Sequence, residues 1–275
     1  MRIHLVSGAL AVALLAACTP TTTPTTTPTT SLPASAPPVS TTPTTHSSTP
    51  TSTPATTTQA PPARVYPWHT NIIATTFWVG EIFDPNAEDG SQVLSTYDDQ
   101  WMAHYGGCDG KVSAGRCDTE PRTAENGYFP RGMTPKENPF YLDLPFDDLN
   151  NVAARKQRQL VVPWASDPGY ANAVSMLKNR WVEITRNGRT CYGQIEDAGP
   201  GQYHDAAYVF GSNDARPKNT KFNHAGMDVS PALNGCLGFG DLNGESDLIN
   251  WRWIEPGNVP DGPWKRVVTT RPAKP

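Results

Sequence analysis

Two aspartates near the C-terminal end of the chain stand where they could act as acids or bases. Asp197 ends the run Cys191–Asp197 and precedes Ala-Gly-Pro-Gly, and Asp228 lies in Met-Asp-Val just before Ser-Pro. Glycine and proline force a turn beside each strand, so we expect both carboxylates at the mouth of a sheet. Carboxylates placed this way can do general acid–base chemistry on a sugar chain.

Each aspartate also has a structural interpretation. Asp197 could satisfy the backbone amides of its turn. Asp228 lies just ahead of a short helix expected over residues 230–237, with Ser230 as N-cap, Pro231 at the first helical position and Gly238 after its end. The amides at a helix N-terminus favour a negative charge, so this placement would lower the pKa of Asp228.

Further side chains near these aspartates are candidates for binding a ligand. Glu81 follows the first expected strand and could supply a second carboxylate, although an exposed glutamate is the commoner case. His204 and Asp205 lie between the two aspartates and could form a base with its orienting group, or simply belong to a surface loop. The aromatic candidates for stacking on sugars are Trp78, Tyr203 and Tyr208.

The four cysteines Cys108, Cys117, Cys191 and Cys236 predict two disulfides, for which three pairings are possible. Cys108 and Cys117 flank a glycine-containing loop, so a local bridge is the economical choice, and Cys191 would then pair with Cys236. A zinc site is the competing interpretation, but no C-x-x-C or H-x-x-x-H spacing is present. We therefore expect no metal and no cofactor.

The N-terminus is typical of an export signal. A basic start is followed by an apolar run over residues 5–17, too short to span a bilayer, and Leu15-Ala-Ala-Cys18 resembles the lipobox of bacterial lipoproteins. We expect residues 1–18 to form a lipoprotein signal peptide with Cys18 as the lipidated residue, the alternative being an ordinary signal peptide that contains a cysteine. A lipidated Cys18 would anchor the protein to the outer face of the cell membrane.

Residues 19–64 are almost wholly Thr, Pro, Ser and Ala, with Arg64 as the single full charge. Such a segment has too little apolar surface to fold, so we expect a disordered stalk that carries the rest of the chain into the cell wall. Residues 65–275 are long enough for one domain. This part holds all 26 acidic residues and no basic stripe, which argues against nucleic acid as a partner, and we expect a monomer.

Short strands separated by Pro, Gly and Asn dominate residues 65–275. Alternation predicts one packed and one wet face in several of them, and along the run that ends at Asp197 it places Cys191, Gly193, Ile195 and Asp197 on one face. Short strands with closely spaced turns indicate a small closed barrel. The expected strands cover residues 72–79, 140–144, 160–162, 181–185, 191–196, 249–254 and 266–269.

These segments resemble the double-psi β-barrel shared by expansins, barwin-like proteins, the rare lipoprotein A domain and glycoside hydrolase family 45. The similarity is carried by residues 182–190, by Ile-Glu-Asp197-Ala-Gly-Pro, by Met-Asp228-Val-Ser-Pro-Ala-Leu and by Asn-Trp-Arg-Trp253. It implies a mainly β fold, a six-stranded double-psi β-barrel with long loops and a few short helices. Gly199 stands where expansins have a tyrosine, with Tyr203 as its substitute, and residues 198–227 form a long insertion.

By this resemblance Asp228 corresponds to the aspartate required for wall loosening, which is the general acid in the hydrolases, and Asp197 to the other groove aspartate. We expect a cell-envelope lipoprotein whose barrel binds a wall polysaccharide, either peptidoglycan or a cellulose-like glucan. Whether the polymer is loosened or cleaved stays open. If the protein is an enzyme, it is a lytic transglycosylase or a glycoside hydrolase that uses Asp228. The alternative is a non-catalytic barwin-like surface module that binds a protein partner.

Overall fold

A computed structural model describes residues 64–86, 90–170, 173–244 and 247–273. The expected signal peptide, Cys18 and nearly all of the expected stalk lie outside these residues. Within the described parts of the chain, no helix is both long and apolar enough to cross a lipid bilayer.

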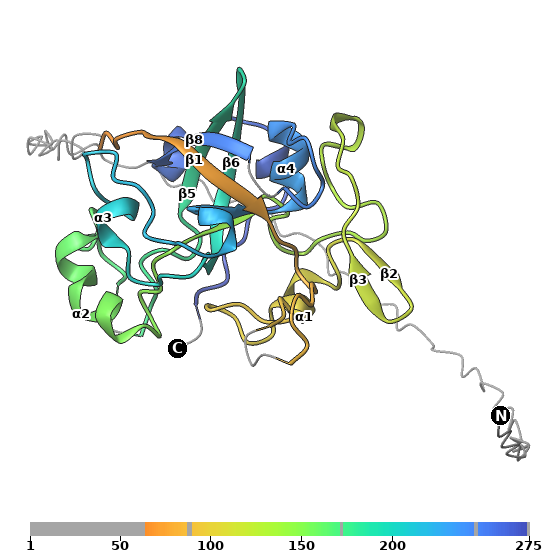
Figure 1. Cartoon of the computed structure of the whole chain (residues 1–275), viewed down its shortest axis with the longest axis horizontal. Coiled ribbons are helices and arrows are strands. Elements are labelled where there is room, and N and C mark those ends of the chain that lie inside the picture. The colour runs from red at the N-terminus through yellow and green to blue at the C-terminus, as the bar shows by residue number, and fades with distance from the viewer. Residues whose placement is uncertain (1–63, 87–89, 171–172, 245–246, 274–275) are drawn as a thin grey trace, which may run out of the picture. The chain divides into compact units, whose positions relative to one another are not determined.

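Six strands close into a barrel in the order β1-β7-β4-β6-β5-β8. Figure 1 labels β1, β5, β6 and β8 among them. The fold is therefore mainly β, as the sequence predicts. β1 pairs in parallel with β7, and β4 pairs in parallel with β6, whereas the other pairings are antiparallel. The barrel strands are β1 (His69–Thr76), β4 (Tyr141–Leu144), β5 (Trp181–Arg186), β6 (Arg189–Ala198), β7 (Met227–Val229) and β8 (Asp247–Ile254).

Helices and a separate hairpin surround the barrel. Figure 1 shows α2 and α3 on one side and the β2–β3 hairpin on the other. The α-helices are α1 (Trp101–Tyr105), α2 (Val152–Val161), α3 (Ala206–Val209) and α4 (Pro231–Leu237). The hairpin joins β2 (Lys111–Ser113) to β3 (Arg116–Asp118), and short 3-10 turns lie at η1 (Ala124–Asn126), η2 (Phe222–His224), η3 (Pro256–Asn258) and η4 (Pro263–Lys265).

Local sequence explains the elements nearest the candidate site. Asn187 and Gly188 both have positive φ, 48° and 79°, which is the backbone of a tight turn between β5 and β6. Ser230 caps α4 by accepting a hydrogen bond from the amide of Leu233, and Gly238 ends the helix in the left-handed conformation. The predicted helix over residues 230–237 is confirmed, and its cap is Ser230, not Asp228.

Two of the predicted strands are wrong. Residues 160 and 161 are the last of α2 and Val162 is its C-cap, because Asn151 accepts hydrogen bonds from the amides of Ala153 and Ala154 and starts a helix of ten residues. Residues 266–269 run outside the sheet, where the amide of Thr269 donates to the side chain of Gln194 instead of to a neighbouring strand.

Both predicted disulfides form, Cys108–Cys117 and Cys191–Cys236. The second bridge joins β6 to α4, which fixes the helix that follows Asp228 against the strand that carries Asp197. The core of the barrel is rich in aromatic side chains, among which Trp251 and Tyr208 are fully buried. A smaller aromatic cluster around Trp101 and Tyr141 packs the segment before β2 against β4.

Candidate functional site

One row of residues crosses four neighbouring barrel strands and forms the floor of the candidate site. Thr75 on β1 pairs with Asp228 on β7, and Asp228 pairs in turn with Asp143 on β4. Asp143 then pairs with Asp197 on β6. Register partners on adjacent strands point to the same face of a sheet. Three aspartates therefore lie side by side, and Asp143 stands between the two that the sequence singled out.

A β-bulge brings Asp197 into this row. Leu142 pairs with Ile195 while Asp143 pairs with Asp197, so Glu196 is the extra residue on β6. Because Leu142 and Asp143 point to opposite faces of β4, Ile195 and Asp197 must do the same. The predicted shared face of Ile195 and Asp197 is therefore wrong, since simple alternation does not include a bulge.

A cavity of about 490 Å³ opens above this row. Asp143, Asp197 and Asp228 line it together with Glu81, and none of the described lining residues is Lys, Arg or His. Aromatic and apolar side chains also line the cavity, namely Phe77, Trp78, Phe83, Leu94, Tyr203 and Phe222. The site is thus an acidic cavity with an aromatic wall.

Hydrogen bonds fix the three aspartates differently. Asp143 accepts a bond of 3.0 Å from the backbone amide of Asp228. Asp197 accepts bonds from the amides of Thr96, at 2.7 Å, and Ala198, at 2.8 Å. Asp228 accepts a bond from the hydroxyl of Thr75. The amide-binding role considered for Asp197 is therefore present, whereas the amide at the start of α4 is bound by Ser230.

Burial shifts the pKa of all four acids upward. Burial, followed by the charges of Asp228 and Asp197, raises the pKa of Asp143 well above its usual range. Burial and then the charges of Glu81 and Asp197 raise the pKa of Asp228 to about 7. The pKa of Asp197 rises only to about 6, because the hydrogen bonds that it accepts from amides oppose the effect of burial. Burial raises the pKa of Glu81 to about 7. The lowering expected for Asp228 is therefore wrong.

The structure brings Trp78, Glu81 and Tyr203 to the cavity with the two aspartates, but it separates Tyr208 and His204 from them. Tyr208 is fully buried, and its hydroxyl accepts a 2.8 Å bond from the Trp251 indole in the core. His204 is exposed and does not line the cavity. Its neighbour Asp205 is buried and accepts the amide of Lys218 at 2.8 Å.

Sequence reasoning missed Asp143. The signal that could have found it is a charged residue inside the apolar strand Tyr141–Leu144, where an unpaired charge is costly and needs a reason. Among the described residues, no group of three or more His, Cys, Asp or Glu side chains is arranged to hold a metal ion.

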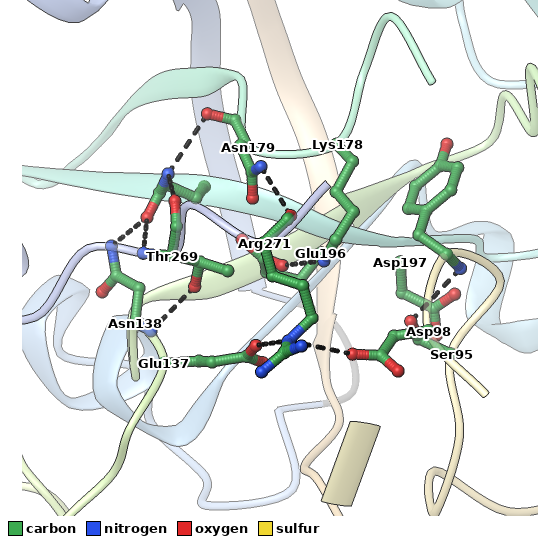
Figure 2. Close-up of polar contacts among 12 residues, drawn as sticks. Ser95, Asp98, Glu137, Asn138, Lys178, Asn179, Glu196, Asp197, Thr269 and Arg271 are labelled. Carbon is green, nitrogen blue, oxygen red and sulfur yellow. Dashed lines mark hydrogen bonds and ion pairs between the residues drawn. The ribbon is translucent and has the colours of Figure 1, made fainter. Parts of the chain in front are cut away.

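A second polar network lies beside Asp197, as Figure 2 shows. The ammonium of Lys178 lies 2.5 Å from the carboxylate of Glu196, the bulged residue, and both side chains are almost fully buried. Arg271 lies between Glu137, at 3.1 Å, and Asp98, at 3.9 Å. The amide of Thr269 donates to the side chain of Gln194 on β6, so the C-terminal segment that carries Arg271 joins the loop before α1 to the strand that carries Asp197.

Comparison of the sequence with protein-family models and with curated proteins found no match.

Proposed function

We propose that this protein binds a wall polysaccharide in the acidic cavity and cleaves its glycosidic bonds, with Asp228 as the general acid. The observation that carries the proposal is the position of Asp228 at a cavity of about 490 Å³, with a pKa raised to about 7. A carboxyl group with such a pKa still holds its proton near neutral pH and can give it to a leaving oxygen.

Asp197 is the second carboxylate. Hydrogen bonds from the amides of Thr96 and Ala198 oppose the effect of burial on the pKa of Asp197, whereas no amide of the described residues does so for Asp228, which favours an ionised Asp197 beside a protonated Asp228. The two residues are separated by β4, so their backbones are about two strand spacings, roughly 9.5 Å, apart. An inverting hydrolysis, in which a water molecule fits between acid and base, needs the two carboxyl groups about 6.5–9.5 Å apart, and a retaining one needs them about 5–5.5 Å apart. A lytic reaction would use Asp228 alone and a hydroxyl of the sugar.

Asp143 holds the acid in place. It accepts the backbone amide of Asp228, and its own raised pKa keeps it protonated beside the other two aspartates. In this role it is a positioning residue. The closed six-stranded barrel with mixed pairing is compatible with the double-psi barrel that the sequence resembles, and we include that topology in the proposal.

We also propose that the protein is a lipid-anchored component of the cell envelope. The support is in the sequence alone, from the lipobox-like Leu15-Ala-Ala-Cys18 and the Thr/Pro-rich stalk. Growth of the native host with a palmitate analogue should label the protein, and Cys18→Ala should remove the label. Labelling of the Cys18→Ala variant would overturn the anchor.

The decisive experiment incubates the full-length protein in detergent with insoluble peptidoglycan and with cellulose, and measures both retention and released fragments. Wild type should bind one polymer and release fragments, whereas Asp228→Asn should bind it without release and melt at nearly the same temperature. The mass of the fragments separates the reactions, because hydrolysis adds one water per cut and the lytic reaction adds none. Retention on neither polymer would overturn the proposal and favour the protein-binding alternative.

A further inference from the structure

We propose that Phe222 is a specificity residue that stacks on a sugar ring at the cavity wall and selects uncharged, β-linked glycans with flat ring faces. This inference rests on the proposed function, and it names the substrate class of the same site. Phe222 belongs to the insertion of residues 198–227, for which the resemblance offers no role.

The backbone at Phe222 is strained. Phe222, Asn223 and His224 have φ angles of 44°, 58° and 59°, so three consecutive residues with side chains occupy the left-handed region. In that region the Cβ atom crowds the following carbonyl oxygen, which is why side-chain-bearing residues enter it singly and usually as Asn or Asp. Strain of this kind persists only where the surrounding structure imposes it, and it gathers at ligand-binding sites.

A set of hydrogen bonds imposes the conformation. Asn219 is nearly fully buried, donates to the carbonyl of Ala225 at 2.9 Å and accepts the amide of Lys221 at 2.9 Å. The amide of Ala225 donates to the carbonyl of Phe222 at 3.1 Å, and the amide of Gly226 donates to Ile73 on β1 at 2.9 Å. The turn is therefore closed on itself and joined to the barrel.

The ring of Phe222 gains little from this arrangement in the free protein. The residue is 61% exposed, so its apolar surface remains largely in water. The ring of Phe222 lines the cavity and lies against the loop after Asp197. A Cβ atom added to Gly201 in that loop would be 3.5 Å from the Cε2 atom of Phe222. A strained backbone that holds an exposed ring at the edge of a cavity is explained if a ligand covers the ring.

The lining of the cavity indicates which ligand that is. No described lining residue is a Lys, Arg or His that could pair with a uronate or a phosphate, and the ionised carboxylate of Asp197 repels anionic polymers. An aromatic face packs well against the C–H face of a pyranose whose substituents are all equatorial. Both an N-acetylated wall glycan and a plain glucan have such β-linked rings, so the shared chemistry is an uncharged β-linked pyranose chain.

The test measures binding of three hexasaccharides by calorimetry, in an Asp228→Asn background so that none is cleaved. The probes are cellohexaose, the β-1,4 hexamer of N-acetylglucosamine, and hexagalacturonate. The background protein should bind at least one neutral hexamer, and which of the two binds more tightly separates the glucan from the N-acetylated source. Phe222→Ala should weaken that binding at least fivefold, Phe222→Trp should keep it within about twofold, and hexagalacturonate should not bind.

His224→Gly is the matched control. It relieves left-handed strain in the same turn but keeps the ring, and His224 does not line the cavity. Its affinity should stay within about twofold of the background protein. Equal binding by Phe222→Ala would overturn the role of Phe222 and leave the proposed function standing. Tight binding of hexagalacturonate would overturn the selection by charge, and binding of no hexamer by the background protein would overturn both proposals.

Discussion

The backbone amide of Asp228 donates a 3.0 Å hydrogen bond to the carboxyl group of Asp143, its register partner on the neighbouring strand. Asp143 is only 3% exposed and is flanked on its other side by Asp197. Three carboxyl groups in one row cannot all be ionised cheaply, because each charge raises the free energy of the next. The row therefore behaves as a proton-holding unit, and its properties should depend on pH.

The first prediction concerns how the free energy of unfolding depends on pH. Glu81, Asp197, Asp228 and the buried Glu196 have pKa values raised to between about 6 and about 7, and burial also raises the pKa of Asp143 well above its usual range. A group with a raised folded pKa contributes stability that is present below its unfolded pKa and is lost as pH rises through the folded pKa. Their contribution should therefore decline from about pH 4 to above pH 7.

Asp143→Asn isolates one part of this effect. Asparagine mimics the protonated acid and can still accept the Asp228 amide, so the variant should melt like wild type at pH 4 and higher than wild type at pH 8. The variant must be compared with wild type at each pH, because His69 titrates in both proteins. Burial lowers the pKa of His69 to about 4, so His69 reduces the stability of both proteins as pH falls from 6.5 to 4, against the gain expected from the buried acids. Melting curves by circular dichroism at each pH provide the measurement. An advantage of the variant in melting temperature that shrinks as pH rises would contradict the prediction.

The second prediction separates capping from acid chemistry. Ser230→Ala should cost about 1 kcal/mol of unfolding free energy, because it removes the oxygen that accepts the amide of Leu233. Asp228→Asn should cost much less, since Asp228 does not cap α4. Urea denaturation of the two variants at pH 6 measures both values. A larger loss for Asp228→Asn than for Ser230→Ala would assign Asp228 a structural role.

The third prediction concerns Gly199, where the backbone passes close to the side chain of Asp143. A Cβ atom added at Gly199 would lie 2.6 Å from Oδ2 of Asp143, which is closer than a carbon and an oxygen atom can approach unless one of them shifts. Gly199→Ala should therefore destabilise the protein by about 1–3 kcal/mol and weaken polymer retention. Gly257→Ala is the control, because nothing lies within 4 Å of its added Cβ. Equal melting temperatures for the two variants would show that the row can move aside.

The fourth prediction concerns the buried pair behind the bulge. Lys178→Met should cost about 3–5 kcal/mol, because it leaves Glu196 buried without its cation. The double variant Lys178→Met/Glu196→Leu should recover most of that loss. Lys265→Met is the matched control, since its partner Asp261 is fully exposed and such surface pairs contribute at most about 1 kcal/mol. Chemical denaturation compares all three, and a loss for Lys178→Met no greater than for the control would contradict the burial of the pair.

Local patterns in the sequence determined the elements whose signals are local. The Asn187-Gly188 turn, the alternation in β5 and β8, and the Ser230 cap depend on neighbours a few residues apart, so these elements could be predicted. The strand predicted at residues 160–162 is wrong because three apolar residues are too few to show a period. The N-cap at Asn151, nine residues earlier, starts a helix that extends into this segment.

Tertiary structure alone decided which side chains share the site. Asp143, Asp197 and Asp228 come from segments far apart in sequence, and only the register of β4 with β6 and β7 places them in one row. The bulge at Glu196, invisible to alternation, decides that Asp197 faces Asp143. Tyr203 and Tyr208 looked equivalent in the sequence, yet packing put one at the cavity and the other in the core, because burial depends on what lies across the barrel and not on the residue type.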